Sequence, residues 1–328
     1  IRASEKSLGE LAQEKSRTAD NVPIRLLLNI ELPSDVGAVK KVNAEGVGLY
    51  RTEFLFMNRP DFPGEEEQFQ AYRRVIKKLG RPITIRTLDI GGDKMSQDMR
   101  GELVASSSPL GLRAIRYCLR SPKIFVTQLR AILRASAYGS ASILIPMLSN
   151  ISEVDQVLGI VEETKEALRR ERKRFDDAIP VGGMIEVPAA AVSAEQFADK
   201  LDFLSIGSND LIQYTLAIDR VDDSVNYLYD PLHPAILRLL RSIVKASGKA
   251  GIPLSICGEL AGNSRYTRLL LGLGLRIFSM DDAGSLLEIK KIAMGTDVAK
   301  SRRRVDRMLR TSDSTALRQQ LERLNISA

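Results

Sequence analysis

Short apolar runs alternate with longer amphipathic segments along most of this chain. Eight runs of aliphatic and β-branched residues predict strands, at Arg25–Ile30, Val47–Arg51, Ile83–Asp89, Ser142–Met147, Val181–Val187, Phe203–Gly207, Pro253–Gly258 and Arg276–Met280. The segments between them have the spacing of amphipathic helices, at Ser34–Asn43, Glu65–Leu79, Leu110–Ala137, Ser152–Phe175, Ala189–Ala198, Asn209–Asp219 with Pro234–Gly251, Ser264–Leu271 and Ala283–Met294. Strands that alternate with helices in this way pair in parallel through right-handed crossovers.

The strand runs are apolar at nearly every position, as in RLLLNI and ILIPM, which is typical of strands covered on both faces. Eight such strand–helix units predict the α/β class and a closed (β/α)8 TIM barrel over residues 25–296. The alternative is an open doubly wound sheet, which normally carries a GxGxxG segment after its first strand, and the chain has none. Residues 1–24 are predicted to be a short helical linker, and residues 297–328 a helical appendage outside the barrel.

Composition narrows the class of protein. Of the 328 residues, 44% are hydrophobic but only 5% are aromatic and none is Trp, so the core is predicted to consist mainly of Leu, Ile, Val and Ala. No apolar run approaches the ~18–20 residues that cross a membrane, and the first residues lack the apolar centre of a signal peptide. The two cysteines form no CxxC or metal-binding pattern. We therefore expect a cytoplasmic protein with reduced thiols.

The charge is concentrated in the C-terminal segment. Residues 298–328 hold eight Lys and Arg against three acids, which accounts for +5 of the net charge of +7. Basic stretches of this kind sometimes bind nucleic acid or an acidic partner. The segment lacks interleaved aromatic residues and any known nucleic-acid module, so a solvated basic helix is favoured and nucleic acid is not an expected partner.

Arginines follow several strand ends, and in a barrel all strand ends meet at one face. A single arginine in such a place is more often a surface residue. Four of them, converging with other polar residues, indicate a ligand with several negative charges, such as a phosphate and a carboxylate. They are Arg51, Arg86, Arg113 and Arg220, and Lys94 in RTLDIGGDK adds a further cation.

Two carboxylates at neighbouring strand ends are metal candidates. Glu186 follows one apolar run, and Asp210 follows the next in Gly-Ser-Asn-Asp, where a strand passes directly into a helix and Asn209 adds an amide. Mg²⁺ commonly takes one or two carboxylates and completes its shell with water and substrate oxygens. The alternative is helix capping, because Pro188 follows Glu186 closely.

Cys257 stands at the end of the seventh predicted strand. The simpler interpretation is a small core residue. At the rim, an ordinary thiol with a pKa near ~8.5 is mostly protonated at neutral pH and can donate a proton. Cys118 falls on a helix pattern and is predicted to be a packing residue, and His233 lies between prolines in a loop, which makes it a poor candidate for a general base.

Five segments together resemble the C-terminal phosphoenolpyruvate-binding barrel of Enzyme I of the bacterial phosphotransferase system, within the wider family of phosphoenolpyruvate-utilising enzymes. The nitrogen-related branch of Enzyme I is included in this resemblance. The segments occur in the family's order and span about 220 residues. They are GVGLYRTEFLFM at 46–57, RTLDIGGDK at 86–94, MIEVPAA at 184–190, SIGSNDLIQYTLAIDR at 205–220 and CGELAG at 257–262.

The resemblance implies a role for each candidate. Arg51, Arg86 and Arg113 match arginines that hold phosphate, and Asn209 and Arg220 match substrate-contacting residues. Glu186 and Asp210 match the Mg²⁺ ligands, and Cys257 matches the acid that protonates the enolpyruvate carbon. The implied activity is transfer of the phosphoryl group of phosphoenolpyruvate to a histidine, with release of pyruvate. The implied partners are a phosphohistidine domain and an HPr-like phosphocarrier protein, and the implied assembly is a homodimer.

The chain departs from the family pattern in four places. Residues 107–113 read Ser-Ser-Pro-Leu-Gly-Leu-Arg where the family usually has Asn-Pro-Phe-Leu-Gly-Trp-Arg, and the segment after Lys94 lacks the usual Pro-Tyr. Asn263 replaces an Asp. His233 does not match the phosphorylated histidine, which we expect on a domain outside this chain.

Two other functions therefore stay open at this point. One is a non-catalytic barrel that senses phosphoenolpyruvate or acts as a scaffold. The other is an Mg²⁺-dependent lyase that acts on 2-oxo acids, because related barrels use Mg²⁺ and arginine with enolates.

Overall fold

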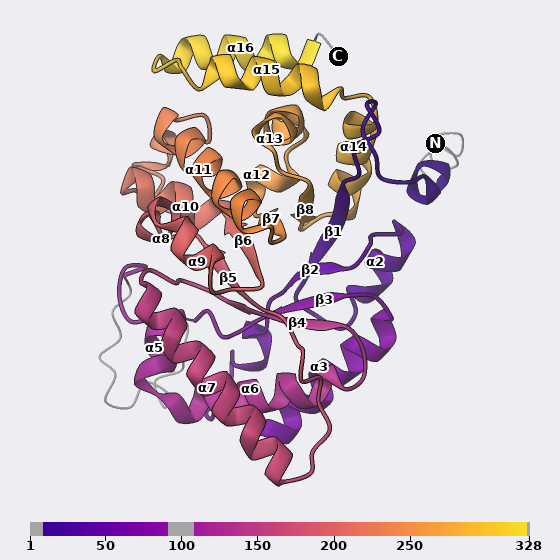
Figure 1. Cartoon of the computed structure of the whole chain (residues 1–328), viewed down its shortest axis with the longest axis vertical. Helices are drawn as coiled ribbons and strands as arrows, with labels where there is room; N and C mark the ends of the chain where they lie inside the picture. The colour runs from indigo at the N-terminus through magenta and orange to yellow at the C-terminus, as the bar shows by residue number, and fades with distance from the viewer. Residues whose placement is uncertain (1–8, 91–107, 327–328) are drawn as a thin grey trace.

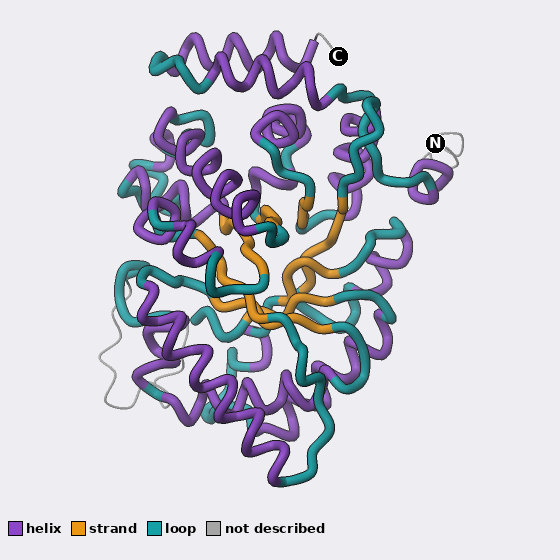
Figure 2. Tube along the Cα trace, viewed as in Figure 1, coloured by secondary structure: helices purple, strands orange, loops and turns teal. Residues whose placement is uncertain are grey.

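Eight parallel strands form a closed barrel in the computed structural model, which describes residues 9–90 and 108–326 (Figures 1 and 2). The strands follow one another in chain order, and the first pairs with the last, so the sheet has no open edge. They are β1 (Arg25–Ile30), β2 (Val47–Tyr50), β3 (Ile83–Arg86), β4 (Ala141–Ile145), β5 (Val181–Ile185), β6 (Phe203–Gly207), β7 (Leu254–Cys257) and β8 (Ile277–Met280). The TIM-barrel prediction is confirmed, and the open sheet is excluded.

Helices surround the barrel between successive strands (Figure 1). They are α2 (Val36–Lys41), α3 (Glu65–Leu79), α5 (Ala114–Arg120), α6 (Pro122–Ser136), α7 (Ile151–Arg170), α8 (Pro188–Val192), α9 (Ala194–Ala198), α10 (Ser208–Leu216), α11 (Pro234–Ala250), α12 (Glu259–Gly262), α13 (Thr267–Leu273) and α14 (Ala283–Met294). Local signals explain where several begin: Asn150 and Glu153 form a capping box at α7, and Pro122 and Pro234 occupy the first positions of α6 and α11. The described residues also contain 3₁₀ turns at Glu53–Leu55, Asn226–Leu228 and Ser264–Tyr266.

The main core lies between the strands and the surrounding helices. Its largest fully buried side chains include Tyr50, Tyr72, Phe125, Phe197 and Phe278. A second, smaller cluster lies inside the barrel and joins four strands through Leu49, Leu144, Met184 and Cys257. This inner cluster forms an apolar floor beneath the mouth of the barrel, on which the polar site described below is built.

Within residues 9–24, the helix is shorter than the sequence pattern predicts. Residues 9–13 are helical, and the chain then turns so that Arg17 and Pro23 form an isolated antiparallel bridge. Thr18 explains the turn, because its hydroxyl donates to Asp20 at 2.6 Å and accepts from the backbone N–H of Val22 at 3.0 Å. These local bonds replace a continuing helix.

Two C-terminal helices, α15 (Val298–Met308) and α16 (Ser314–Ile326), lie side by side outside the barrel, and α15 packs against α13 (Figure 1). The acids of this segment turn toward the barrel or cap a helix: Asp306 pairs with Arg241, Glu322 pairs with Arg265 at 2.5 Å, and Asp313 accepts from the first turn of α16. The predicted appendage is thus present as a helical hairpin. Across the described parts of the chain, no helix has the length and apolarity needed to cross a bilayer.

Candidate active site

A cavity of about 670 Å³ opens where the carboxyl ends of the strands meet. Eight of the nine site residues predicted from the sequence line it: Arg51, Arg86, Arg113, Glu186, Asn209, Asp210, Arg220 and Cys257. The ninth, Lys94, lies outside the described residues. Within the described part of the chain, the lining carries four arginines but also six carboxylates, so the cavity is not simply a basic pocket.

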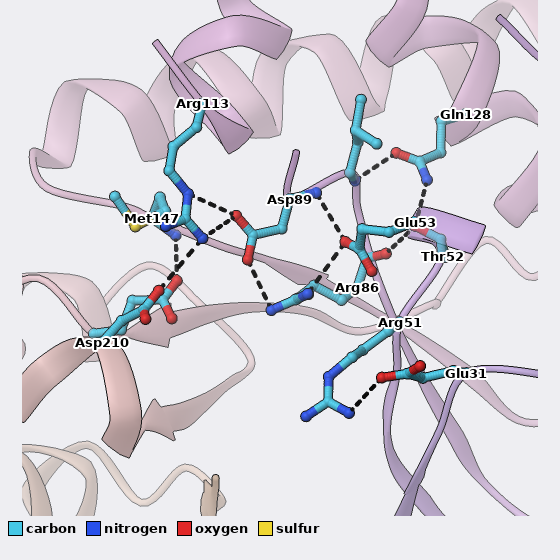
Figure 3. A network of polar contacts seen from close by, with 12 residues as sticks. Glu31, Arg51, Thr52, Glu53, Arg86, Asp89, Arg113, Gln128, Met147 and Asp210 are labelled. Atoms are coloured by element: carbon cyan, nitrogen blue, oxygen red, sulfur yellow. Dashed lines mark hydrogen bonds and ion pairs between the residues drawn. The ribbon is translucent and has the colours of Figure 1, made fainter. Parts of the chain in front are cut away.

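Arg86, at the end of β3, is the most enclosed of the four arginines, with 11% of its side chain exposed. One guanidinium nitrogen lies 3.1 Å from Glu53 Oε1 and the other lies 2.9 Å from Asp89 Oδ2 (Figure 3). Burial alone would lower the pKa of Arg86, but the negative charges of Glu53 and Asp89 outweigh burial and raise it. Arg86 is therefore a fixed positive charge whose orientation is set by two acids.

Arg113, just before α5, contacts the other oxygen of the Asp89 carboxylate. Its Nη2 lies 2.8 Å from Asp89 Oδ1 and 3.4 Å from Asp210 Oδ2 (Figure 3). Its Nη1 donates to the hydroxyl of Tyr214 at 3.0 Å, and that hydroxyl donates to the carbonyl of Pro109 at 3.1 Å. Tyr214 on α10 thereby ties the altered segment before Arg113 to the site.

Arg51 and Arg220 are held more loosely. Arg51, after β2, lies 3.0 Å from Glu31 and 2.9 Å from Asp281, and both of these acids are exposed. Arg220, in the loop after α10, lies 3.6 Å from the exposed Glu259. These two arginines line the cavity without the enclosure that surrounds Arg86.

The two metal candidates face a crowded acidic environment. Glu186 is buried after β5 and its Oε1 accepts from the backbone N–H of Met147 at 2.7 Å, while Asp210 lies in the first turn of α10. Burial raises the pKa of Glu186 to about 8, and the charges of Asp210 and Asp89 add to this effect. A cation between Glu186 and Asp210 would offset this repulsion.

The donor set fits a hard divalent cation. In residues 9–90 and 108–326, no group of three or more His, Cys, Asp or Glu side chains gathers around one point. Two carboxylates together with water and substrate oxygens are the usual surroundings of Mg²⁺. The glycine at position 207 leaves room for the Glu186 carboxylate, because a Cβ there would lie only 2.5 Å from Glu186 Oε2.

Asn209 and its neighbours tie β7 to the start of α10. The Asn209 side-chain oxygen accepts from the backbone N–H of Glu259 at 2.9 Å, and the Ser208 hydroxyl donates to the carbonyl of Cys257 at 2.7 Å. Gly258 permits this close approach, since its φ is 88° and a Cβ would lie 2.7 Å from the Asn209 oxygen. The position of Asn209 therefore depends on the Cys-Gly-Glu turn after β7.

Cys257 lies on the floor of the cavity. Its thiol donates to the carbonyl of Ile206 at 3.4 Å. Burial raises the pKa of Cys257 to about 11, and the negative charge of Glu186 acts in the same direction. The sulfur therefore carries its proton at neutral pH, as a proton donor must.

Two residues of this network, Glu53 and Asp89, had no predicted role. Each follows a strand end and stands two or three positions after an arginine, in RTE and RTLD. That spacing is the sequence feature that could have indicated acids paired with the arginines, although it does not show which arginine each acid contacts. The remaining candidates lie apart from the cavity lining: Cys118 is buried in α5, and the His233 Nδ1 accepts from the backbone N–H of Ala235 at the start of α11.

Comparison with known proteins adds a second line of evidence. The family described as PEP-utilising enzyme, PEP-binding domain (PEP is phosphoenolpyruvate) matches residues 5–298. A phosphoenolpyruvate-protein phosphotransferase of Cupriavidus necator is 48% identical over 321 residues, which cover 96% of this chain and 55% of that protein. The corresponding protein of Geobacillus stearothermophilus is 48% identical over 290 residues, which cover 87% of this chain and 50% of that protein. The chain thus spans about half the length of these relatives.

Among solved structures, a citrate lyase of Burkholderia xenovorans is similar with a TM-score of 0.52 and 15% identity, over 97% of this chain and 94% of that one. A likeness at this level of identity shows the barrel fold alone.

Proposed function

The chain belongs to the PEP-utilising enzyme family through its PEP-binding domain, and from this premise we propose that it is the PEP-binding barrel of a PEP-protein phosphotransferase. In that reaction the phosphoryl group passes from PEP to a histidine on a separate domain, and pyruvate is released. The observation that carries the proposal is the convergence of four arginines, two carboxylates and a protonated thiol in one cavity. The names of the two relatives at 48% identity support the same activity.

The arginines are proposed to bind the phosphoryl group and to neutralise its oxygens as charge moves toward the leaving group. Arg86 and Arg113 are already oriented by ion pairs at 2.8–2.9 Å, so little ordering is needed when the ligand arrives. Arg51 would also contact the phosphoryl group, and Asn209 and Arg220 would bind the rest of the substrate.

Glu186 and Asp210 are proposed to hold Mg²⁺, which when bound offsets the negative charge of the substrate and the cavity. Six carboxylates stand against four arginines in the described lining, so arginine charge alone does not favour entry of a trianionic ligand. We therefore expect PEP and the divalent cation to strengthen each other's binding.

Cys257 is proposed to supply the final proton. Attack by the histidine nitrogen on phosphorus breaks the bond to the enol oxygen, and the electron pair of that bond leaves with enolpyruvate. The methylene carbon then takes the proton from the Cys257 thiol and becomes the methyl group of pyruvate. The thiolate regains a proton from solvent, which its raised pKa favours at neutral pH.

Several features stay predictions: the phosphohistidine domain, the HPr-like phosphocarrier protein, the homodimer, a role in sugar transport or membership of the nitrogen-related branch, and the cytoplasmic location. A non-catalytic sensor differs from the proposed enzyme only in lacking turnover. A lyase gains no support from the similarity to citrate lyase, because that similarity concerns the fold.

Binding is tested by calorimetry with PEP and Mg²⁺, together and separately. We expect micromolar to millimolar binding that requires both, and Arg303→Ala on the exposed face of α15 as a control with unchanged binding. Absence of heat at millimolar PEP with Mg²⁺ would refute the proposal.

Turnover is tested with a phosphohistidine domain supplied separately. Cys257→Ala should keep PEP binding and slow pyruvate release by a factor of about 10²–10⁴, whereas Cys118→Ala should release pyruvate at the wild-type rate. Unchanged release in Cys257→Ala would show that this thiol is a packing residue. Wild-type binding without any pyruvate release would instead favour the sensor.

A further inference from the structure

One carboxylate already occupies the space between the two inner arginines of the cavity. The two oxygens of Asp89 are divided between them, with Oδ2 lying 2.9 Å from Arg86 and Oδ1 lying 2.8 Å from Arg113 (Figure 3). The Asp89 side chain is only 4% exposed, so solvent does not screen these contacts. Two guanidinium groups that share one small anion have the arrangement with which proteins bind phosphate.

The backbone that leads into Asp89 is held in place by two hydrogen bonds. Its own N–H donates at 2.9 Å to Glu53 Oε1, the oxygen that also contacts Arg86. The preceding N–H, of Leu88, donates at 2.8 Å to the buried side chain of Gln128. With the main chain held at Leu88 and Asp89, and the carboxylate paired with two arginines, the negative charge of Asp89 stays in place when an anion arrives.

We propose that Asp89 is a built-in counter-anion that disfavours free phosphate in this cavity and so helps determine its specificity for PEP. Inorganic phosphate would have to bind beside a fixed negative charge and to arginines that already have partners. PEP brings a carboxylate as well, for Asn209 and Arg220, and oxygens for a cation on Glu186 and Asp210. These added contacts offset the repulsion that phosphate alone meets. The inference rests on the proposed function and concerns the specificity of the same site.

The test measures binding of inorganic phosphate to the chain in the presence of a chelator, by calorimetry. Asp89→Asn keeps the size of the side chain and removes its charge. One arginine also loses a carboxylate oxygen as its hydrogen-bond acceptor, and a phosphate oxygen can replace it. We expect phosphate to bind about tenfold more tightly than to the wild type. A gain in affinity is informative because a merely structural role for Asp89 would lead to a loss.

The chain offers a matched control. Asp219→Asn removes the same charge from the same cavity lining, and Asp219 Oδ1 accepts from the backbone N–H of Val221 rather than from an arginine. Its phosphate affinity should stay within about twofold of the wild type. Equal gains in the two variants would overturn the proposal, because net charge alone would then explain them.

Unchanged or weaker phosphate binding in a folded Asp89→Asn variant would also overturn the proposal. If that variant does not fold, phosphate binding is measured with Asp89→Ser instead. The same gain in phosphate affinity is expected, and its absence would overturn the proposal. The experiment involves neither Mg²⁺ nor phosphoryl transfer, so its failure leaves the proposed function standing. Conversely, a wild type that does not bind PEP with Mg²⁺ removes the proposed function itself.

Discussion

The four arginines in the described lining of the cavity form two pairs that the protein holds very differently. The inner pair, Arg86 and Arg113, is 11% and 17% exposed, and each member contacts two enclosed carboxylates. The outer pair, Arg51 and Arg220, is 27% and 35% exposed, and the side chains of its acidic partners are 49–69% exposed. The same residue type at the same end of the barrel therefore has two roles.

The difference follows from the cost of burying charge. Breaking a buried ion pair leaves the remaining charge without compensation, whereas an exposed pair contributes little to stability. The inner pair should therefore be part of the folded structure as well as of the site. The outer pair should affect ligand binding while leaving the stability of the fold nearly unchanged.

The largest effect is expected for Arg86→Ala. It leaves Glu53 and Asp89 enclosed without their shared partner, so the free energy of unfolding should fall by about 3–5 kcal/mol. Binding of PEP with Mg²⁺ should be lost at millimolar ligand. Urea unfolding and calorimetry measure the two effects, with Arg303→Ala as a control that changes stability by less than about 0.5 kcal/mol.

A loss of PEP binding in Arg86→Ala with a stability change below about 1 kcal/mol would contradict this comparison. It would mean that Glu53 and Asp89 find other partners or water, and that enclosure does not make the inner pair structural.

Sequence patterns predicted the fold far better than they predicted this pairing. All eight strands were found because strands covered on both faces read as continuous apolar runs, and the ends of those runs located Arg86 and Asp210. The shared contact of Asp89 with Arg86 and Arg113 was not predictable, because it depends on how separate loops meet in space. The turn at Glu53–Leu55 was missed because three residues are too few to show a helical period.

The second prediction concerns the acid beside the inner pair. Burial raises the pKa of Glu186 to about 8, above its ordinary value of 4.5. Between these two values the unfolded chain has lost this proton while the folded chain keeps it, so stability falls as pH rises. Glu186→Gln has no carboxyl group at this position, so its free energy of unfolding should not fall in this way. At pH 9 in a chelator it should be more stable than the wild type by roughly 2–4 kcal/mol.

Urea unfolding at pH 5 and pH 9 measures this difference, which should nearly vanish at pH 5. With Mg²⁺ and PEP present the wild type should be the more stable protein, because the Gln variant lacks a proposed metal ligand. Equal pH dependence in the two proteins would show that Glu186 is ionised in the fold without a penalty.

A smaller effect is expected where Gly207 adjoins the same carboxylate. In Gly207→Ala the new Cβ would lie 2.5 Å from Glu186 Oε2 and 2.9 Å from the Glu186 Cβ, so the side chain must shift. We expect a loss of about 1–3 kcal/mol in stability together with weaker Mg²⁺-dependent PEP binding. Gly159→Ala is the matched control, because its Cβ meets nothing within 4 Å and α7 should gain up to about 1 kcal/mol. Unaltered stability and binding in Gly207→Ala would show that the position of Glu186 is adjustable.

The smallest change in stability is expected for Arg220→Ala, and it separates the two pairs most directly. Its ion pair with Glu259 is 3.6 Å long, and Glu259 is 69% exposed, so unfolding should change by less than about 0.5 kcal/mol. PEP affinity should nevertheless fall about tenfold, since one charge-assisted contact to the ligand is lost. Glu259→Gln is the control, because it removes the same pair but leaves the guanidinium to bind substrate.

Two outcomes would contradict this prediction. If Arg220→Ala weakens the fold as much as Arg86→Ala does, the exposure of an arginine does not show whether it is structural or binds the ligand. If both the fold and PEP affinity stay unchanged, Arg220 lines the cavity without contacting the ligand, and the inner pair with Arg51 must account for recognition of the substrate.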